Sequence, residues 1–160
     1  MSRETCQMNR NSQASPKIRR FRKEDLPQIM DIENHAFPKT AYPKEFLLQY
    51  ARRLTDGFVV LEKGRVILGY IIFDQGGHVY STAVKVSQRR KGFGTLLIAH
   101  ASEHAGERLW LEVRSKNTGA IAFYRKVGMK VVGKVPAYYA DDDALIMVLE
   151  ENALEAGATK

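Results

Sequence analysis

The apolar residues of this chain follow two spacings in turn, one typical of helices and one typical of strands. Between residues 24 and 54 they recur every three or four positions, which predicts two helices, with Pro43 at the start of the second. Further along, strand-like runs alternate with two more helical stretches, and turns such as residues 74–77 separate them. The order βααβββαβαββ indicates an α/β or α+β fold. The predicted strands are 18–21, 58–62, 66–73, 78–86, 108–113, 129–135 and 144–149, and the predicted helices are 24–37, 43–54, 94–103 and 118–127.

The two ends of the chain lack these spacings. Residues 1–16 are rich in Ser, Asn, Gln, Arg and Lys, so we expect a disordered, basic and polar tail there. Residues 151–160 are expected to form a short C-terminal tail. A chain of 160 residues suits one domain of ordinary size, which we place at residues 17–150.

Charge and cysteine content narrow the class of protein. The net charge of +7 favours an anionic partner, which a nucleic acid, a membrane surface or a phosphorylated ligand would each satisfy. Cys6 is the single cysteine, which excludes an internal disulfide and a thiolate-rich metal site. The chain shows neither the apolar core of a signal peptide nor an apolar run of about 18 residues. We therefore expect a cytoplasmic protein without a metal or a membrane partner, and we interpret all four histidines as structural or surface groups: His35, His78, His100 and His104.

A basic segment that contains glycine lies at residues 88–94, between a predicted strand and a predicted helix. The first N–H groups of a helix lack internal partners, and the helix macrodipole makes that end partly positive. A phosphate placed there can accept several backbone hydrogen bonds at once. Gly92 and Gly94 let the backbone approach closely, and Arg89, Arg90 and Lys91 add positive charge. The combination predicts a phosphate-binding loop.

Three other interpretations of this segment have weaker support. An isolated G-x-G is usually a turn, here beside a solvated basic run. A P-loop for nucleoside triphosphates fits poorly, because Thr95-Leu96 follow Gly94 in place of Lys and Ser or Thr. A dinucleotide-binding loop fits better, since Glu112 lies near the position of a ribose-binding acid, but Leu97 occupies the third glycine position.

The segment Arg89-Arg90-Lys91-Gly92-Phe93-Gly94 resembles the pattern [QR]-x-x-G-x-[GA], the acetyl-CoA pyrophosphate loop of the GNAT N-acetyltransferase superfamily. The strand at residues 83–86 resembles the one on which that superfamily lays the pantetheine arm, and the order of elements agrees over residues 18–150. The resemblance implies a GNAT fold, in which a central mixed, mostly antiparallel twisted sheet of about seven strands is flanked by about four helices. It also implies acetyl-CoA as cosubstrate and a set of cofactor-binding residues: Thr82, Ala83, Val84, Arg89, Arg90, Lys91, Gly92, Phe93, Gly94, Thr95, Asn117 and Tyr124.

A second run narrows the resemblance to the RimI-like branch, the ribosomal-protein-alanine and related protein N-terminal acetyltransferases. The resemblance implies that Glu112 is the general base and Tyr124 the general acid. A carboxylate can take the proton that an attacking amine must lose. A neutral Tyr of pKa about 10 can protonate a departing thiolate of pKa about 8.5. The residues that carry this resemblance are Leu109-Trp110-Leu111-Glu112-Val113-Arg114, then Asn117, Ala120, Ile121, Tyr124, Gly128 and Met129, and finally Tyr138-Tyr139, Asp143-Ala144 and Met147.

Each of these candidate residues also has a structural interpretation, which the sequence leaves open. Tyr124 lies on the apolar stripe of its helix and could fill the core. Asn117 stands where an N-cap is expected. Glu112 alternates with Leu111 and Val113, so it lies on the other face of its strand and could be a solvated charge.

The acceptor is the least defined part of this interpretation. In the N-terminal acetyltransferases that the chain resembles, the peptide enters between the first helix pair and the last hairpin, which implies a substrate-binding set of Phe37, Pro38, Tyr42, Tyr138 and Tyr139. Phe37 is equally suited to the core. We expect direct acetyl transfer, in a ternary complex, to the N-terminal α-amine of a protein or peptide such as a ribosomal protein, by a monomer or weak homodimer with no nucleic-acid partner.

Two alternatives to this acceptor stay open. The same fold could acetylate a small amine such as a polyamine, an antibiotic or an amino acid. The chain could also be a non-catalytic acyl-CoA-binding or basic nucleic-acid-binding module, although mere binding would not require Glu112 and Tyr124.

Overall fold

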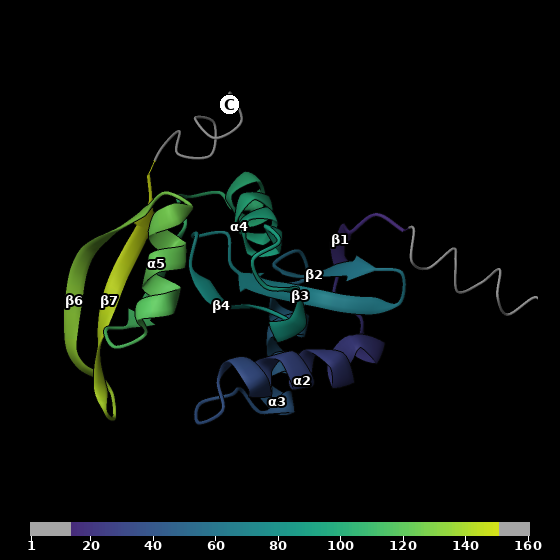
Figure 1. The fold of residues 1–160 in the computed structure, drawn as a ribbon, viewed down its shortest axis with the longest axis horizontal. Helices are drawn as coiled ribbons and strands as arrows, with labels where there is room; N and C mark the ends of the chain where they lie inside the picture. Colours follow the sequence, from purple (N-terminus) through teal and green to yellow (C-terminus); the bar gives the residue numbers. More distant parts are fainter. Residues whose placement is uncertain (1–13, 151–160) are drawn as a thin grey trace, which may run out of the picture. The chain divides into compact units, whose positions relative to one another are not determined.

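The computed structural model of the chain describes residues 14–150 (Figure 1), so the tails predicted at residues 1–16 and 151–160 lie outside the described residues except for 14–16. The described part contains seven strands and four helices, in the predicted order. The strands are β1 (Lys17–Arg20), β2 (Phe58–Lys63), β3 (Val66–Phe73), β4 (Val79–Val84), β5 (Trp110–Arg114), β6 (Met129–Tyr139) and β7 (Asp142–Leu149). The helices are α2 (Leu26–Ala36), α3 (Lys44–Arg53), α4 (Phe93–His104) and α5 (Thr118–Lys126), with 3₁₀ turns at Lys23–Asp25 and Val86–Gln88.

The strands form two sheets in place of the single sheet that the sequence predicted. The first has the order β1-β2-β3-β4 and the second the order β5-β7-β6. The ladders β1–β2, β2–β3, β5–β7 and β6–β7 are antiparallel, and an isolated parallel bridge joins His78 to Trp110. The prediction of a mixed, mostly antiparallel arrangement of seven strands and four helices is therefore confirmed.

The described residues gather into two compact units, each built from two stretches of chain. Among the described residues, the first unit consists of residues 14–72 and Ser81–Leu97, and the second of Phe73–Tyr80 and residues 98–150. Strands β3 and β4 and helix α4 each contribute residues to both units. The prediction of a single domain at residues 17–150 stays a prediction.

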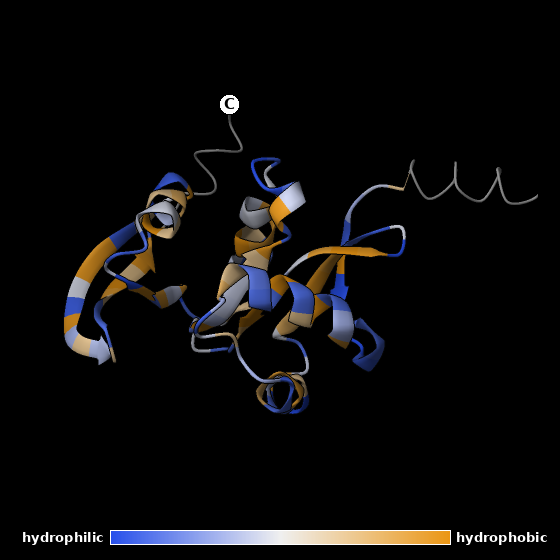
Figure 2. Cartoon of the chain, turned by 60° about the horizontal axis from the view of Figure 1, so that its bottom comes forward, coloured by the Kyte–Doolittle hydropathy of each residue, from blue (hydrophilic) through white to orange (hydrophobic). Residues whose placement is uncertain are grey.

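The core of the first unit lies along β2 and β3, whose residues are almost all buried, and Figure 2 shows the hydrophobic colour running along these strands. Successive residues of a strand face opposite sides of a sheet. The hydroxyl of Tyr70 accordingly meets Glu33 of α2 on one side. On the other side, a Cβ added to Gly69 would lie 3.2 Å from Cδ1 of Leu97 in α4 and 2.8 Å from the carbonyl oxygen of Ala83. Gly69 thus allows β3 and β4 to approach closely.

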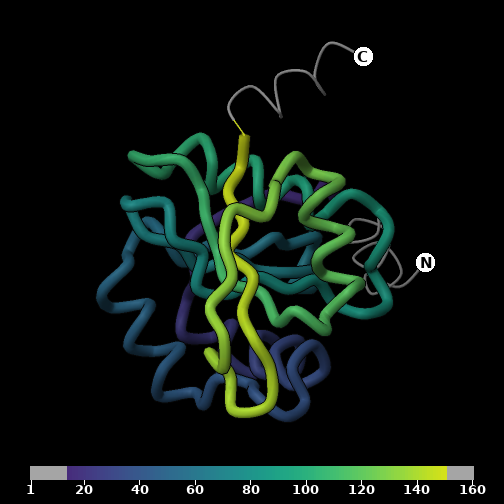
Figure 3. Tube along the Cα trace, turned by 90° about the vertical axis from the view of Figure 1, so that its left-hand side faces the viewer, coloured from purple at the N-terminus to yellow at the C-terminus, as the bar shows by residue number. Residues whose placement is uncertain are grey.

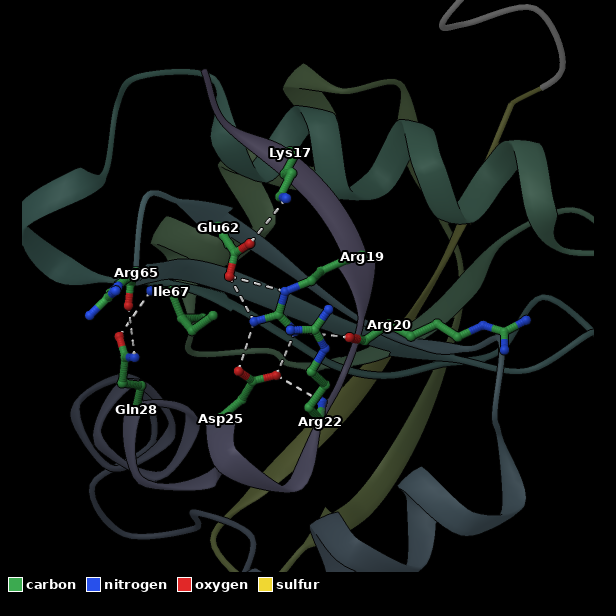
Figure 4. Close-up of polar contacts among 9 residues, drawn as sticks. All are labelled: Lys17, Arg19, Arg20, Arg22, Asp25, Gln28, Glu62, Arg65 and Ile67. Carbon is green, nitrogen blue, oxygen red and sulfur yellow. Dashed lines mark hydrogen bonds and ion pairs between the residues drawn. The ribbon is translucent and has the colours of Figure 1, made fainter. Parts of the chain in front are cut away.

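A buried ion network fastens the edge strand β1 (Figure 4). Both terminal nitrogens of Arg19 lie 2.8 Å from the carboxylate of Asp25, and Nη2 also lies 2.7 Å from Oε2 of Glu62 in β2. The backbone N–H of Arg22 donates to Asp25 at 2.8 Å, which caps the 3₁₀ turn before α2. Since the three charged side chains are 8–15% exposed, the pairs lie largely out of water. This network fixes β1 to the chain that leads into α2.

The second unit is built on the long β6–β7 hairpin, which runs down the middle of Figure 3 in yellow-green. The sequence predicted that β6 would end at Val135, but the strand continues to Tyr139. The ladder register shifts between Val135 and Tyr139, so Pro136, Ala137 and Tyr138 lie outside the pairing. Proline is tolerated there because β6 is an edge strand. The core of the second unit includes apolar residues that are at most 9% exposed: Leu109, Leu111, Val113, Ile121, Met129, Met147 and Leu149.

Candidate functional site

The predicted phosphate-binding loop lies in the first unit, directly before helix α4. The N–H of Leu96 donates to the carbonyl of Gly92 at 3.1 Å, and this is the first hydrogen bond of the helix. The N–H groups of Phe93, Gly94 and Thr95 therefore precede the helical bonding pattern and are available to a ligand. The macrodipole adds a partial positive charge at this end. The loop has the geometry that binding a phosphate requires.

The backbone of this loop adopts left-handed conformations at two positions. Arg90 has φ 65° and Gly92 has φ 84°. A non-glycine residue at positive φ is strained, and such strain gathers at ligand-binding turns. A Cβ at Gly92 would meet no atom within 4 Å, so its conformation, not crowding within the chain, requires glycine there. The two residues turn the chain sharply enough to present its N–H groups.

The side chains of the loop supply cationic groups near these N–H groups. Nε of Arg89 lies 3.4 Å from the carbonyl oxygen of Val84, and Nζ of Lys91 donates to Oε1 of Gln88 at 3.1 Å. Arg89, Arg90 and Lys91 are exposed. Within residues 14–150, their charges are not engaged by carboxylates, so they remain available to an anion.

Strand β4 leads into the loop and carries three more of the predicted cofactor-binding residues. The hydroxyl of Thr82 donates to the carbonyl of Tyr70 in β3 at 2.9 Å, so this side chain holds the sheet. Thr82, Ala83 and Val84 are half-buried. Beyond them, the N–H of Lys85 donates to the carbonyl of Leu68 at 2.7 Å, and the ladder ends. Their contact with a cofactor stays a prediction.

The predicted general base lies in the second unit, on β5. Leu111 and Val113 are buried and Glu112 between them is half-buried, which agrees with the predicted alternation. Glu112 is not simply a solvated charge, because its Oε2 lies 2.8 Å from Nε2 of His78. Burial alone would raise the pKa of Glu112, but the hydrogen bond and the charge of His78 outweigh burial and hold that pKa below its usual value. The carboxylate is therefore ionised at neutral pH.

The interpretation of His78 as a structural or surface group did not anticipate this pair. The chain brings His78 to β5 through Gly77, whose φ of 85° and close approach to the carbonyl of Arg108 exclude any side chain. The N–H of Trp110 donates to the carbonyl of Gly77 at 2.9 Å, and the Trp110 ring stacks on the imidazole at 4.1 Å between centroids. The spacing of residues along the sequence does not predict the contact between His78 and Glu112. The turn glycine Gly77, directly before His78, is the local feature of the sequence that could have drawn attention to this histidine.

The predicted general acid, Tyr124, lies on α5 in the second unit. Burial raises the pKa of Tyr124 to about 12, and the nearby Tyr139 adds to the rise. The phenol therefore stays protonated at neutral pH and can donate a proton. Asn117 caps the helix, since its Oδ1 accepts from the N–H of Ala120 at 3.2 Å, so its expected N-cap role is confirmed. A contact of Asn117 with a cofactor stays a prediction.

The aromatic residues predicted to bind the acceptor fall on two segments. Tyr138 and Tyr139 lie at the end of β6, with Tyr138 52% exposed and Tyr139 half-buried. The guanidinium of Arg114 lies 4.2 Å from the centre of the Tyr139 ring, which holds that ring beside β5. Burial raises the pKa of Tyr139, and the Glu112 carboxylate adds to the rise. The second unit thus brings Glu112, His78, Tyr124 and Tyr139 into one neighbourhood.

The other three acceptor candidates lie on the loop between α2 and α3 in the first unit. Phe37 is half-buried and ends α2, because its N–H donates to the carbonyl of Glu33 at 2.8 Å. Pro38 is exposed. Tyr42 packs against two rings of α3, at 6.3 Å from Phe46 and 5.6 Å from Tyr50. Phe37 is thus partly a core residue, which agrees with its structural interpretation. Part of the residue is exposed, and its contact with an acceptor stays a prediction.

The described residues include no group of three or more His, Cys, Asp or Glu side chains placed to hold a metal ion. Over the same range, each helix is too short or too polar to cross a membrane.

Comparison with known proteins points to one family. The profile of the acetyltransferase (GNAT) family matches residues 26–129. The chain is 34% identical over 152 residues to an N-alpha-acetyltransferase of Sulfurisphaera tokodaii, covering 82% of this chain and 90% of that protein. It is 30% identical to the [ribosomal protein bS18]-alanine N-acetyltransferase of Escherichia coli, covering 78% and 90%.

Solved structures agree with this assignment. Naa20 of Chaetomium thermophilum, crystallised with a bisubstrate analogue, superposes with a TM-score of 0.74 at 28% identity and covers 86% of this chain and 87% of its own. Ard1 of Thermoplasma volcanium gives a TM-score of 0.72 at 25% identity and covers 85% and 99%. On these matches over nearly all of the described residues, the chain belongs to the GNAT acetyltransferase family.

Proposed function

We propose that this acetyltransferase transfers the acetyl group of acetyl-CoA to the N-terminal α-amine of a protein or peptide. The observation that carries the proposal is the Glu112 carboxylate, half-buried on β5 and hydrogen-bonded to His78, which holds its pKa below the usual value. Relatives named as N-alpha-acetyltransferases support the choice of an α-amine. We propose the cytoplasm as the location, because acetyl-CoA and newly made N-termini occur together there.

The donor is bound by the first unit. The N–H groups of Phe93, Gly94 and Thr95 at the start of α4 bind the pyrophosphate, and Arg89, Arg90 and Lys91 neutralise its charge. The backbone of β4 around Ala83 and Val84 lies beside the pantetheine arm, and its N–H groups stabilise the oxyanion that forms on the thioester carbonyl. No metal takes part in this chemistry.

The transfer is a direct displacement within a ternary complex. The amine nitrogen attacks the thioester carbonyl, a C–N bond forms, and the C–S bond breaks as the tetrahedral intermediate collapses. Glu112, hydrogen-bonded to His78, takes the proton that the nitrogen loses, directly or through a water. Tyr124 gives its proton to the departing thiolate of CoA. An α-amine of pKa about 7.7–8.0 is partly neutral at physiological pH, so one ionised carboxylate suffices as base.

The acceptor-binding candidates are Phe37, Pro38 and Tyr42 before α3 in the first unit, and Tyr138 with Tyr139 at the end of β6 in the second unit. Aromatic rings of this kind offer an apolar surface to the first side chain of a peptide.

The test is an acetylation assay of the full chain with acetyl-CoA. The acceptors are a peptide library that varies the first residues, the same peptides with a blocked N-terminus and a free Lys, and a panel of small amines. We expect acetylation of free N-termini, located on the α-nitrogen by fragmentation mass spectrometry. Turnover only with small amines or with Lys side chains would overturn the proposed acceptor. Binding of CoA without any turnover would overturn the proposed catalytic activity.

A further inference from the structure

The first unit buries a carboxylate that the reaction does not use. Glu33 of α2 is 1% exposed. In the described part of the chain, it receives hydrogen bonds from neutral groups and no cation pairs with it. Burial raises the pKa of Glu33, which is the expected response of a carboxyl without a counter-ion. A buried carboxylate without a charged partner costs free energy of folding, so a hydrophobic residue would serve the core better.

The two oxygens of this carboxylate hold different parts of the unit. Oε2 accepts from the hydroxyl of Tyr70 in β3, and the hydroxyl of Ser81 in β4 lies 3.5 Å from it. The Tyr70 and Ser81 hydroxyls lie 3.0 Å apart, so both sit in one buried cluster. Oε1 accepts from the backbone N–H of Tyr42 at 3.0 Å. The carboxylate therefore joins the sheet to the chain that leads into α3.

Glu33 holds both ends of the loop between α2 and α3. Its backbone carbonyl accepts from the N–H of Phe37 at 2.8 Å, where α2 ends. Its side chain accepts from the N–H of Tyr42, where the loop meets α3. Between these two bonds, the N–H of Thr40 donates to the carbonyl of Phe37 at 3.1 Å. One residue thus sets the position of the segment that carries Phe37, Pro38 and Tyr42.

We propose that Glu33 is a positioning residue for the acceptor: its carboxylate fixes the loop from Phe37 to Tyr42 against β3 and β4, and so determines how tightly the acceptor amine is bound. This inference rests on the proposed function, because it takes the loop to be part of the acceptor site. It goes further in assigning the position of that loop to one buried side chain that touches neither substrate.

Two substitutions at this position separate the roles of shape and of hydrogen bonding. Glu33→Leu keeps much of the volume but removes both acceptors, so the N–H of Tyr42 loses its partner. Glu33→Gln keeps an acceptor for that N–H, and its amide can donate to the Tyr70 hydroxyl, which can donate to Ser81 in turn. We expect Glu33→Leu to raise KM for the peptide by about tenfold, with kcat and KM for acetyl-CoA within about twofold of wild type. Glu33→Gln should restore most of the peptide affinity.

Glu62 supplies the matched control, since it is a carboxylate of the same unit that holds β1 and not the loop. Glu62→Leu should lower the melting temperature but leave KM for the peptide unchanged. Hydrogen exchange gives a second readout that needs no activity. Exchange at the amide of Tyr42 should rise in Glu33→Leu and stay slow in Glu62→Leu. If Glu33→Leu does not fold, Glu33→Asp keeps the charge but is one methylene too short to reach both partners, and it permits the same comparison.

An equal rise of KM for the peptide and KM for acetyl-CoA in the Glu33 variants would overturn this proposal, and so would unchanged hydrogen exchange at the amide of Tyr42. Neither result would contradict the proposed acetylation of peptides. If the wild type acetylates only small amines, the proposed acceptor fails. The exchange measurement, and the KM for the amine that is used, then still decide whether Glu33 positions the loop for that acceptor.

Discussion

Nε2 of His78 lies 2.8 Å from Oε2 of Glu112, and this pair links the end of one turn to the middle of β5. Trp110 stacks on the imidazole on one side and Tyr80 lies 4.3 Å from it, which fixes the ring plane. The hydrogen bond therefore has a defined direction. It holds the pKa of this half-buried carboxylate, which burial alone would raise, below its usual value.

Removing the imidazole should therefore shift the pH dependence of the reaction. In His78→Ala, burial still raises the pKa of Glu112 and the lowering influence of His78 is lost, so that pKa rises. The base is active only when ionised, so the lower acid limb of the kcat/KM profile, which lies below the limb set by the α-amine of the peptide, should move to higher pH. Glu112→Gln, which has no base, should lose kcat by on the order of 10²-fold or more at every pH. An acid limb that stays in place in His78→Ala would show that another group titrates there.

Tyr124→Phe tests the general acid. Burial and Tyr139 raise the pKa of Tyr124 to about 12, so the hydroxyl is protonated across the working pH range and can act only as a donor. Phenylalanine keeps the ring and removes this proton. We expect kcat to fall by on the order of 10²-fold while the dissociation constant of CoA changes little. Calorimetric titration of CoA alongside single-turnover rates separates the two, and wild-type turnover in the variant would exclude this role.

The sequence predicted the parts of the site that depend on one stretch of chain. Gly92 stands at positive φ before α4, and Glu112 lies on the side of β5 opposite Leu111 and Val113, as the loop pattern and the alternation indicated. The family prediction is confirmed by the match over residues 26–129.

The loop pattern and the strand alternation could not predict the contacts between residues that lie far apart in the sequence. His78 reaches Glu112 across 34 positions, and Glu33 reaches Tyr70 across 37. Glu33 lies on the buried face of α2 together with Ile29 and Ile32, and a helical spacing alone does not show that a carboxylate there has partners. Local spacing reports which face a residue occupies, but not which residue of another element stands opposite.

Gly92 and Gly64 offer a matched pair of substitutions in the first unit. Both have positive φ, 84° and 62°, so alanine at either costs about 1–2 kcal/mol of backbone strain. Only Gly92 precedes α4 in the proposed pyrophosphate loop. We expect Gly92→Ala to raise KM for acetyl-CoA by about tenfold, because relief of the strain turns N–H groups away from the phosphate. Gly64→Ala should lose similar stability and keep that KM, and equal KM values in both variants would contradict the loop assignment.

The Arg19 network predicts a loss of stability that depends on pH. In Arg19→Met, the carboxylates of Asp25 and Glu62 lose their buried cation, and the free energy of unfolding should fall by about 3–5 kcal/mol at pH 7. Arg20→Met is the control, because Arg20 pairs with Asp56 where both side chains are about two-thirds exposed, and it should cost about 0–1 kcal/mol. Urea unfolding of the three proteins measures both losses.

Acid should reduce the difference between Arg19→Met and the wild type. Burial raises the pKa of Asp25, but hydrogen bonds from Arg19 and the N–H of Arg22 outweigh it, and the hydrogen bond from Arg19 lowers the pKa of Glu62. Groups with lowered pKa stabilise the fold above their unfolded pKa of about 4, and this stability is lost as pH falls through the folded values. The wild type should therefore lose stability more steeply than Arg19→Met below pH of about 4, since the variant no longer holds these pKa values down. An equal difference between the two proteins at pH 7 and in acid would mean that Arg19 stabilises β1 by packing of its aliphatic stem and not by charge.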